Sequence, residues 1–116
     1  MHKIFDMPVS EVYPHYINKV KRKGQNPDLV DVAITWLTGF DAKTIANHLE
    51  SKTSFRDFFG GAKINQNAPL ITGTICGVKI QEIQDPLMKQ IRYLDKLVDE
   101  LAQGRSLEKV LRTPKD

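Results

Sequence analysis

The sequence predicts a mainly α-helical domain with several short helices and one long C-terminal helix. Apolar residues recur at the three- and four-residue spacing of amphipathic helices, and capping residues, prolines and glycines mark where successive helices begin and end. With 116 residues, 41% of them hydrophobic and 27% charged, the chain has the length and composition of a single globular domain, residues 1–116.

The first helix is expected to begin near Pro14, because a proline fits a first helical turn, where its missing N–H is not needed. Gly24 can take the left-handed conformation that ends a helix. One apolar stripe connects these two signals: Tyr13, Tyr16, Ile17 and Val20.

The second helix has sharper boundary signals. Asn26 is a typical N-cap, Pro27 follows at the first helical position, and Gly39 stands where the helix should end. Its apolar face, which includes Trp36, is so broad that we expect other elements to cover it from more than one side.

Two shorter helices and a loop follow. Asp41 is expected to cap a third helix, and Ser54 to open a very short fourth helix that ends at Gly60 and Gly61. The fourth helix carries an aromatic cluster: Phe55, Phe58 and Phe59. Residues 62–69 contain asparagines and a proline and are predicted to form a loop.

Residues 70–83 are ambiguous. Their β-branched residues favour a strand, whereas Gly73 and Gly77 fit poorly in either a helix or a strand. Propensity leans slightly toward a strand, so we allow for a minor β element in this segment.

The last long helix, residues 86–103, is the clearest element. Asp85 and Pro86 give an N-cap followed by a proline at the first position, and Gly104 stands just past the end. Its apolar residues alternate by four and three, which is an a/d seam: Leu87, Ile91, Leu94, Val98 and Leu101. A final short helical segment begins at Ser106.

Several stretches of the chain resemble the small bacterial proteins grouped as domain of unknown function 2200. They are residues 13–14, 22–24, 36–40, 55–59, 71–73, 76–78, 85–88 and 91–101. The resemblance spans nearly the whole chain and implies an orthogonally packed helical domain from a bacterium, with helix and turn rather than strand in residues 70–83. It implies no activity and supplies no catalytic residues, because no function is known for that family.

The composition disfavours several classes of function. A single cysteine, Cys76, forms neither an intramolecular disulfide nor a multi-cysteine zinc site, and it fits a cytoplasmic location. No apolar stretch is long enough to cross a membrane, and the N-terminus lacks the apolar region of a signal peptide. The three histidines lack metal-site spacing, so we expect no metal and no other cofactor. Cys76 itself is expected to be a small buried side chain rather than a nucleophile.

The candidate functional surface consists of Arg92, Asp95, Asp99 and Trp36. Asp95 and Asp99 lie four residues apart and need nearby cations, which Arg92 and Lys96 can supply. Either Arg92 and Asp95 form a structural ion pair or these carboxylates serve an enzyme site. Trp36 belongs to a group of aromatic residues that is large for so small a domain, so some of them are expected to line a groove or an interface.

A DNA-binding interpretation rests on residues 41–59, whose spacing imitates a helix-turn-helix. The candidate nucleic-acid contacts are Lys21, Arg22, Lys23 and Arg56. Two features argue against this interpretation: the second helix has room for few residues, and Arg56 stands beside Asp57, which phosphate repels. The net charge of +3 is also small for a nucleic-acid-binding domain of this length.

The sequence therefore does not specify an activity, and we name no catalytic residue. The leading hypothesis is a non-enzymatic protein- or small-ligand-interaction module of the bacterial cytosol. The alternatives are a DNA-binding regulator and an enzyme that uses the carboxylates of the last long helix. The a/d seam of that helix also offers a means of forming a homo-oligomer, although packing within the monomer is the simpler use.

Overall fold

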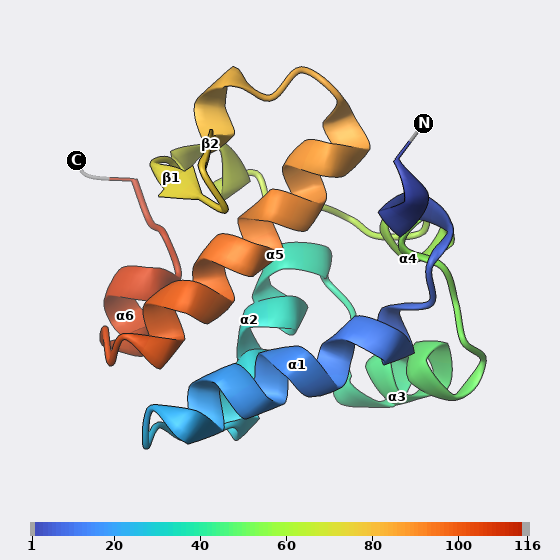
Figure 1. Ribbon diagram of the computed structural model, residues 1–116, viewed down its shortest axis with the longest axis horizontal. Helices are drawn as coiled ribbons and strands as arrows, with labels where there is room; N and C mark the ends of the chain where they lie inside the picture. Colours follow the sequence, from blue (N-terminus) through green and yellow to red (C-terminus); the bar gives the residue numbers. More distant parts are fainter. Residues whose placement is uncertain (1, 115–116) are drawn as a thin grey trace.

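The long helix α5 (Pro86–Ala102) lies at the centre of the computed structural model, which describes residues 2–114 (Figure 1). It runs obliquely across α1 and α2 and packs against α1, α2, α4 and α6. The other helices are α1 (Val9–Arg22), α2 (Asp28–Thr38), α3 (Ala42–Glu50), α4 (Phe55–Gly60) and α6 (Leu107–Val110). The prediction of a mainly α-helical fold with a long C-terminal helix is confirmed.

Most helix boundaries follow from capping groups in the sequence. The side chains of Asp41, Ser54 and Asp85 accept hydrogen bonds from backbone N–H groups in the first turns of α3, α4 and α5. Gly39 and Gly104 follow α2 and α5 with φ angles of 78° and 84°, the left-handed region that a glycine enters at low cost. These predicted boundaries are confirmed to within one residue.

The start of α1 differs from the prediction. The helix begins at Val9, and Pro14 lies inside it. Its first turn is held by a distant segment, because the Val9 N–H donates to the Thr53 carbonyl at 2.9 Å and Pro8 forms an antiparallel bridge with Ser54. These long-range contacts stabilise a helix that the proline alone would shorten.

Residues 70–83 form a small hairpin between two 3-10 turns, η2 (Ala68–Leu70) and η3 (Ile80–Glu82). Strand β1 (Thr74–Ile75) pairs antiparallel with β2 (Val78–Lys79). The two residues between them, Cys76 and Gly77, have φ angles of 53° and 76°, the pair of positive values that a type I′ turn requires. The minor β element is confirmed. The helix and turn that the family resemblance implies are present only as the 3-10 turns and the hairpin turn, so their exclusion of a strand is wrong.

Cys76 is exposed. The expectation of a small buried side chain is wrong, because the tight turn places the residue at the tip of the hairpin, while the neighbouring Ile75 takes the buried position.

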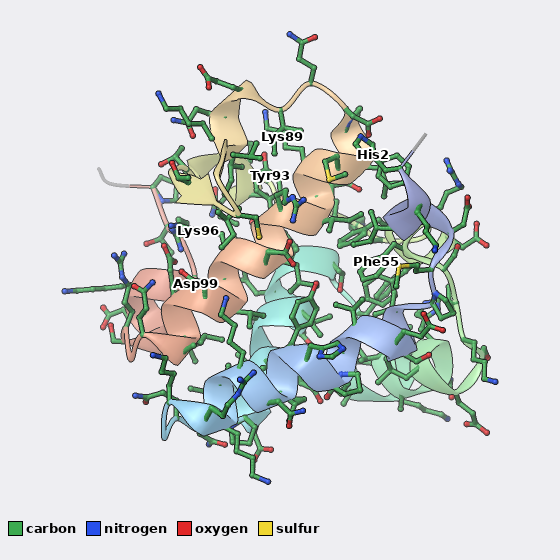
Figure 2. All side chains as sticks on the ribbon, in the orientation of Figure 1. His2, Phe55, Lys89, Tyr93, Lys96 and Asp99 are labelled. Carbon is green, nitrogen blue, oxygen red and sulfur yellow. The ribbon has the colours of Figure 1, made fainter. Side chains whose placement is uncertain are left out.

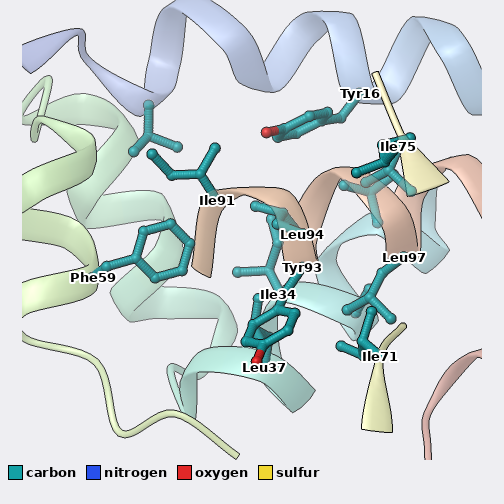
Figure 3. Packing of buried hydrophobic residues seen from close by; sticks show 14 of the residues in the cluster. Tyr16, Ile34, Leu37, Phe59, Ile71, Ile75, Ile91, Tyr93, Leu94 and Leu97 are labelled. Carbon is teal, nitrogen blue, oxygen red and sulfur yellow. The ribbon is translucent and has the colours of Figure 1, made fainter. Parts of the chain in front are cut away.

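The core forms where α5 meets α1, α2 and the hairpin (Figure 3). Ile34 and Leu37 from α2 pack with the buried face of α5, and Phe59 from α4 closes one end. The a/d seam of α5 is part of this core, since its four C-terminal members are almost completely buried: Ile91, Leu94, Val98 and Leu101. The seam is therefore used within the chain.

Candidate functional site

Arg92 and Asp95 lie together on the side of α5 that faces α1. The Tyr16 hydroxyl donates a hydrogen bond to Asp95 Oδ1 at 2.8 Å, and Arg92 Nη1 lies 3.0 Å from Asp95 Oδ2. Both carboxylate oxygens are thus engaged, and the Asp95 side chain is only 17% exposed. Burial, assisted by the negative charge of Asp95, raises the pKa of Tyr16 well above its usual value. The three side chains form a largely buried network that ties α1 to α5.

Asp99 continues this network toward the end of α5. Lys19 Nζ lies 3.0 Å from Asp99 Oδ1, and Gln103 donates to Asp99 Oδ2 at 2.7 Å. Lys96, predicted as the neighbouring cation, instead donates to the Thr74 carbonyl at 3.1 Å and so supports the hairpin. Lys19 takes its place because α1 packs against this side of α5.

A small cleft of about 200 Å³ lies beside this network, between α1, the hairpin and α5. It is lined by His15, Tyr16, Lys19, Ile75, Cys76, Asp95 and Val98. Tyr16, Lys19 and Asp95 are already bonded within the chain, so the exposed residues His15 and Cys76 carry the polar groups that are left for chemistry.

The most buried ion pair among residues 2–114 has no counterpart in the predictions from sequence. Glu100 is only 2% exposed, and both of its carboxylate oxygens accept hydrogen bonds from the guanidinium of Arg112. These bonds hold the segment after α6 against α5, and Arg112 also donates locally to the Val110 carbonyl at 2.7 Å. Glu100 follows the buried Leu97 by three residues, which signals a carboxylate on the core-facing side. Its partner lies twelve residues further on and has no local signal.

The predicted nucleic-acid contacts lie far apart. Lys21, Arg22 and Lys23 are exposed at the C-terminal end of α1, whereas Arg56 lies on α4 at the opposite side of the molecule (Figure 1). Arg56 pairs with Asp6 at 3.3 Å and lies over the Phe5 ring. The structure does not bring the four cations to one face. In addition, α3 packs on α1, while α4 packs on η1 (Lys3–Asp6) and α5.

Trp36 lies on a different surface from Arg92, Asp95 and Asp99. It is half-buried and lines an open hollow of about 510 Å³ with Gly39 and residues 63–67. This loop is fixed to the end of α2, since the Asn65 side chain donates to the Trp36 carbonyl at 3.1 Å and the Lys63 N–H donates to the Thr38 carbonyl at 2.9 Å. The last carbonyls of α2 thereby find partners, and the loop gains a defined position.

The same loop forms one wall of a second hollow, of about 270 Å³, against α5. The residues that line it are mostly apolar or uncharged: Ile64, Asn65, Gln66, Ala68, Pro69, Pro86, Lys89, Gln90 and Tyr93. We call this the α5–loop hollow. It shares Ile64, Asn65 and Gln66 with the Trp36 hollow, so a single stretch of chain separates the two.

Tyr93 is the unusual group of the α5–loop hollow. Its ring points away from α1 (Figure 3), the residue is 6% exposed, and its hydroxyl has no hydrogen-bond partner among residues 2–114. No fully buried side-chain oxygen or nitrogen in this described range lacks a partner, so the hydroxyl must keep a small contact with solvent. The hollow that Tyr93 lines provides that contact. Burial raises the pKa of Tyr93, which keeps the hydroxyl protonated near neutral pH.

Lys89 precedes Tyr93 by one helical turn on the same side of α5 (Figure 2). It is half-buried, and its ammonium has no acidic partner in the part of the chain that the structure describes. The nearby Asp85 carboxylate is engaged as the N-cap of α5. The sequence analysis missed both Lys89 and Tyr93, because a missing partner leaves no local pattern.

No helix among residues 2–114 combines the length and apolarity that a membrane crossing requires. Over the same described range, no three metal-ligating side chains gather in one place.

The fold defines a small helical domain with a preformed hollow on one flank of its central helix. Residues 3–112 match the model of the family described as "Uncharacterized protein conserved in bacteria (DUF2200)", and the chain belongs to that family. The chain is also similar to a solved structure, "Crystal structure of uncharacterized protein SP1917", at 42% sequence identity and a TM-score of 0.89. That match covers 96% of this chain and 93% of the other. No curated protein matches the chain. The predicted family resemblance is confirmed, and no specific activity is indicated by these matches.

Proposed function

We propose that the protein is a non-enzymatic binding module that holds a small molecule in the α5–loop hollow. The observation that carries this proposal is the Tyr93 hydroxyl, which belongs to an almost completely buried side chain, has no partner among residues 2–114 and meets solvent only where the residue lines the hollow. Polar groups near the core are normally hydrogen-bonded to the protein or to ordered water, so a hydroxyl that the described chain leaves unbonded can bond to a molecule in the hollow. A few unsatisfied polar groups in a mainly apolar concavity are typical of a ligand site.

The walls of the hollow support the proposal because they are fixed before any ligand arrives. One wall is the rigid helix α5, which begins at Pro86, and the other is the loop that Asn65 attaches to α2. A site that is already ordered loses less conformational entropy on binding. At about 270 Å³ the hollow lies just below the range of about 300–1,000 Å³ typical of drug-sized ligands, so it suits a small metabolite.

The alternative functions have weaker geometric support. Asp95, the carboxylate nearest to a cleft, is bonded to Tyr16 and Arg92 through both oxygens, so proton transfer would require this network to break. The cations proposed for DNA binding lie on opposite sides of the molecule. Ligand binding in the α5–loop hollow requires neither a broken network nor a change of shape.

The proposal places the module in the cytoplasm and gives it a monomeric state. An exposed free thiol such as that of Cys76 stays reduced in the cytoplasm, where disulfides are rare. Pairing through the α5 seam would compete with the core that already buries it. Light scattering over a range of concentrations tests the assembly, and a dimer whose interface includes α5 would contradict the monomer.

The test of binding is a screen of small-molecule fragments by protein NMR with matched tryptophan variants. We expect binders to shift the backbone amides of residues 64–66 and 89–93. Gln90→Trp should block the hollow and abolish these shifts. Gln84→Trp is the control, since Gln84 is exposed and does not line the hollow. The proposal is wrong if no fragment shifts these amides, or if both variants bind alike.

A further inference from the structure

We infer that the α5–loop hollow takes a small carboxylate with an apolar body, whose carboxylate is bound by Lys89 and Tyr93. This inference rests on the proposed function and adds the chemical class of the ligand. It follows from the charge, the hydrogen-bonding capacity and the walls of the hollow.

The charge on the walls of the hollow determines the sign of the charge that the ligand should carry. Lys89 is the only charged side chain among the residues that line the hollow. The Lys89 residue is half-buried, and its ammonium has no carboxylate partner within residues 2–114. A cation at the edge of a concave, largely apolar surface, with no counter-ion from the described chain, favours an anionic ligand over a neutral or cationic one. An anionic ligand would supply the partner that residues 2–114 do not.

The hydroxyl of Tyr93 adds a hydrogen-bond donor one turn away from Lys89. A tyrosine hydroxyl is protonated at neutral pH, so it can donate to a carboxylate oxygen. An ammonium and a hydroxyl on the same side of one helix can each serve one oxygen of a carboxylate. The Gln90 amide accepts as well as donates, so it does not favour either sign of ligand charge. The Asn65 amide is engaged within the chain, since it donates to the Trp36 carbonyl and accepts from the Asn67 N–H.

The remaining walls define the rest of the ligand. Ile64, Pro69 and Pro86 provide apolar surface and cannot compensate a second charge. A phosphate dianion would find one ammonium and one hydroxyl, fewer donors than such a group usually receives. A monoanion with an apolar ring or short aliphatic body matches both parts of the hollow.

The experiment compares benzoate with benzamide, which has nearly the same shape and no charge, by NMR titration of the full chain. We expect benzoate to shift the amides of residues 64–66 and 89–93 and to bind at least about tenfold more tightly than benzamide. Lys89→Gln should remove most of this preference, and Tyr93→Phe should weaken benzoate severalfold. Lys79→Gln, the control, removes an equal charge from an exposed strand residue and should leave both affinities unchanged.

Each other outcome overturns the inference in a recognisable way. If benzamide binds in the hollow as tightly as benzoate, or if Lys89→Gln behaves like Lys79→Gln, the ligand class is wrong and the binding function stands. If benzoate does not bind while neutral or cationic fragments do, the class is again wrong. If nothing binds there, both the inference and the proposed function fail. A thermal melt of each variant establishes that it is folded.

Discussion

The central helix α5 presents two unlike polar surfaces. Toward α1 and α6, the carboxylates of Asp95, Asp99 and Glu100 are all paired with cations from the same chain. Toward the loop of residues 62–69, the Lys89 ammonium and the Tyr93 hydroxyl have no partner among residues 2–114. We call these the partnered side and the open side.

The difference separates structural from functional polar groups. A polar group near the core that is fully bonded within the chain fixes how helices pack, and its removal should be felt as lost stability. A polar group that is left unbonded adds little to stability, and its removal should be felt in binding. Candidate residues chosen from sequence for their chemistry alone, such as Asp95, cannot be assigned to either kind until their partners are known.

The largest effect is expected from Arg112→Ala on the partnered side. This change leaves the buried Glu100 carboxylate without its main partner and should lower the free energy of unfolding by about 3–5 kcal/mol. Arg105→Ala is the matched control, since Arg105 is 57% exposed and 3.6 Å from Glu100. It should cost less than about 1 kcal/mol. Urea unfolding of both variants measures the difference, and equal losses would contradict the assignment of Arg112 as the main partner.

The same chemical change on the two sides gives the most direct comparison. Tyr16→Phe removes the hydrogen bond to Asp95 and should destabilise the protein by about 1–2 kcal/mol. Tyr93→Phe removes a hydroxyl without a partner and should change stability by less than about 0.5 kcal/mol. Both values come from urea unfolding. A larger loss in Tyr93→Phe than in Tyr16→Phe would reverse the distinction between the sides.

Alkaline pH should weaken the fold through its tyrosines. Burial is the main cause that raises the pKa of Tyr13, Tyr16 and Tyr93, which are all the tyrosines of the chain. In the unfolded chain these groups ionise near about pH 10. The stability that these tyrosines contribute is therefore fully present below that pH and falls above it, by up to about 1.4 kcal/mol per pH unit for the deeply buried Tyr16. Tyr13 and Tyr93 contribute less, because solvent screens their ionised forms. Phenolate absorbance should rise together with unfolding. Ionisation of all three in the folded state near pH 10 would contradict this.

The smallest effect is expected at the hairpin turn, outside both sides. Cys76 holds a φ angle of 53°, a conformation that asparagine adopts more readily. Cys76→Asn should therefore raise the free energy of unfolding by about 0.5 kcal/mol. Cys76→Val, with a β-branched side chain in the same conformation, should lower it. Thermal melts of the two variants check the direction of each change.

The sequence predicts the helices well because their boundaries are set locally. Asp41, Ser54 and Asp85 each lie at most three residues from the N–H groups that they cap, so the pattern is visible in a short window. At α2 the N-cap is Pro27 rather than the predicted Asn26, a difference of one residue. The start of α1 is different. It depends on Thr53, which is distant in sequence, and Pro14 points to a later start.

The candidate site is predicted less well for the same reason. Arg92 and Asp95 lie three residues apart and were found as a pair, while the contribution of Tyr16 comes from another helix. Trp36 was singled out as a surplus aromatic, and it does line a hollow. Lys89 and Tyr93 could not be predicted from the sequence, because their distinctive property is the lack of a partner among residues 2–114. Only the packed structure reveals that property.

The position of Trp36 gives the protein an optical reporter of its own. It is the single tryptophan of the chain, and its indole lies against the loop that separates the two hollows. Any displacement of that loop changes how much water reaches the indole and hence the colour of its emission. Events in the neighbouring hollow can therefore be followed by fluorescence, without attaching a dye.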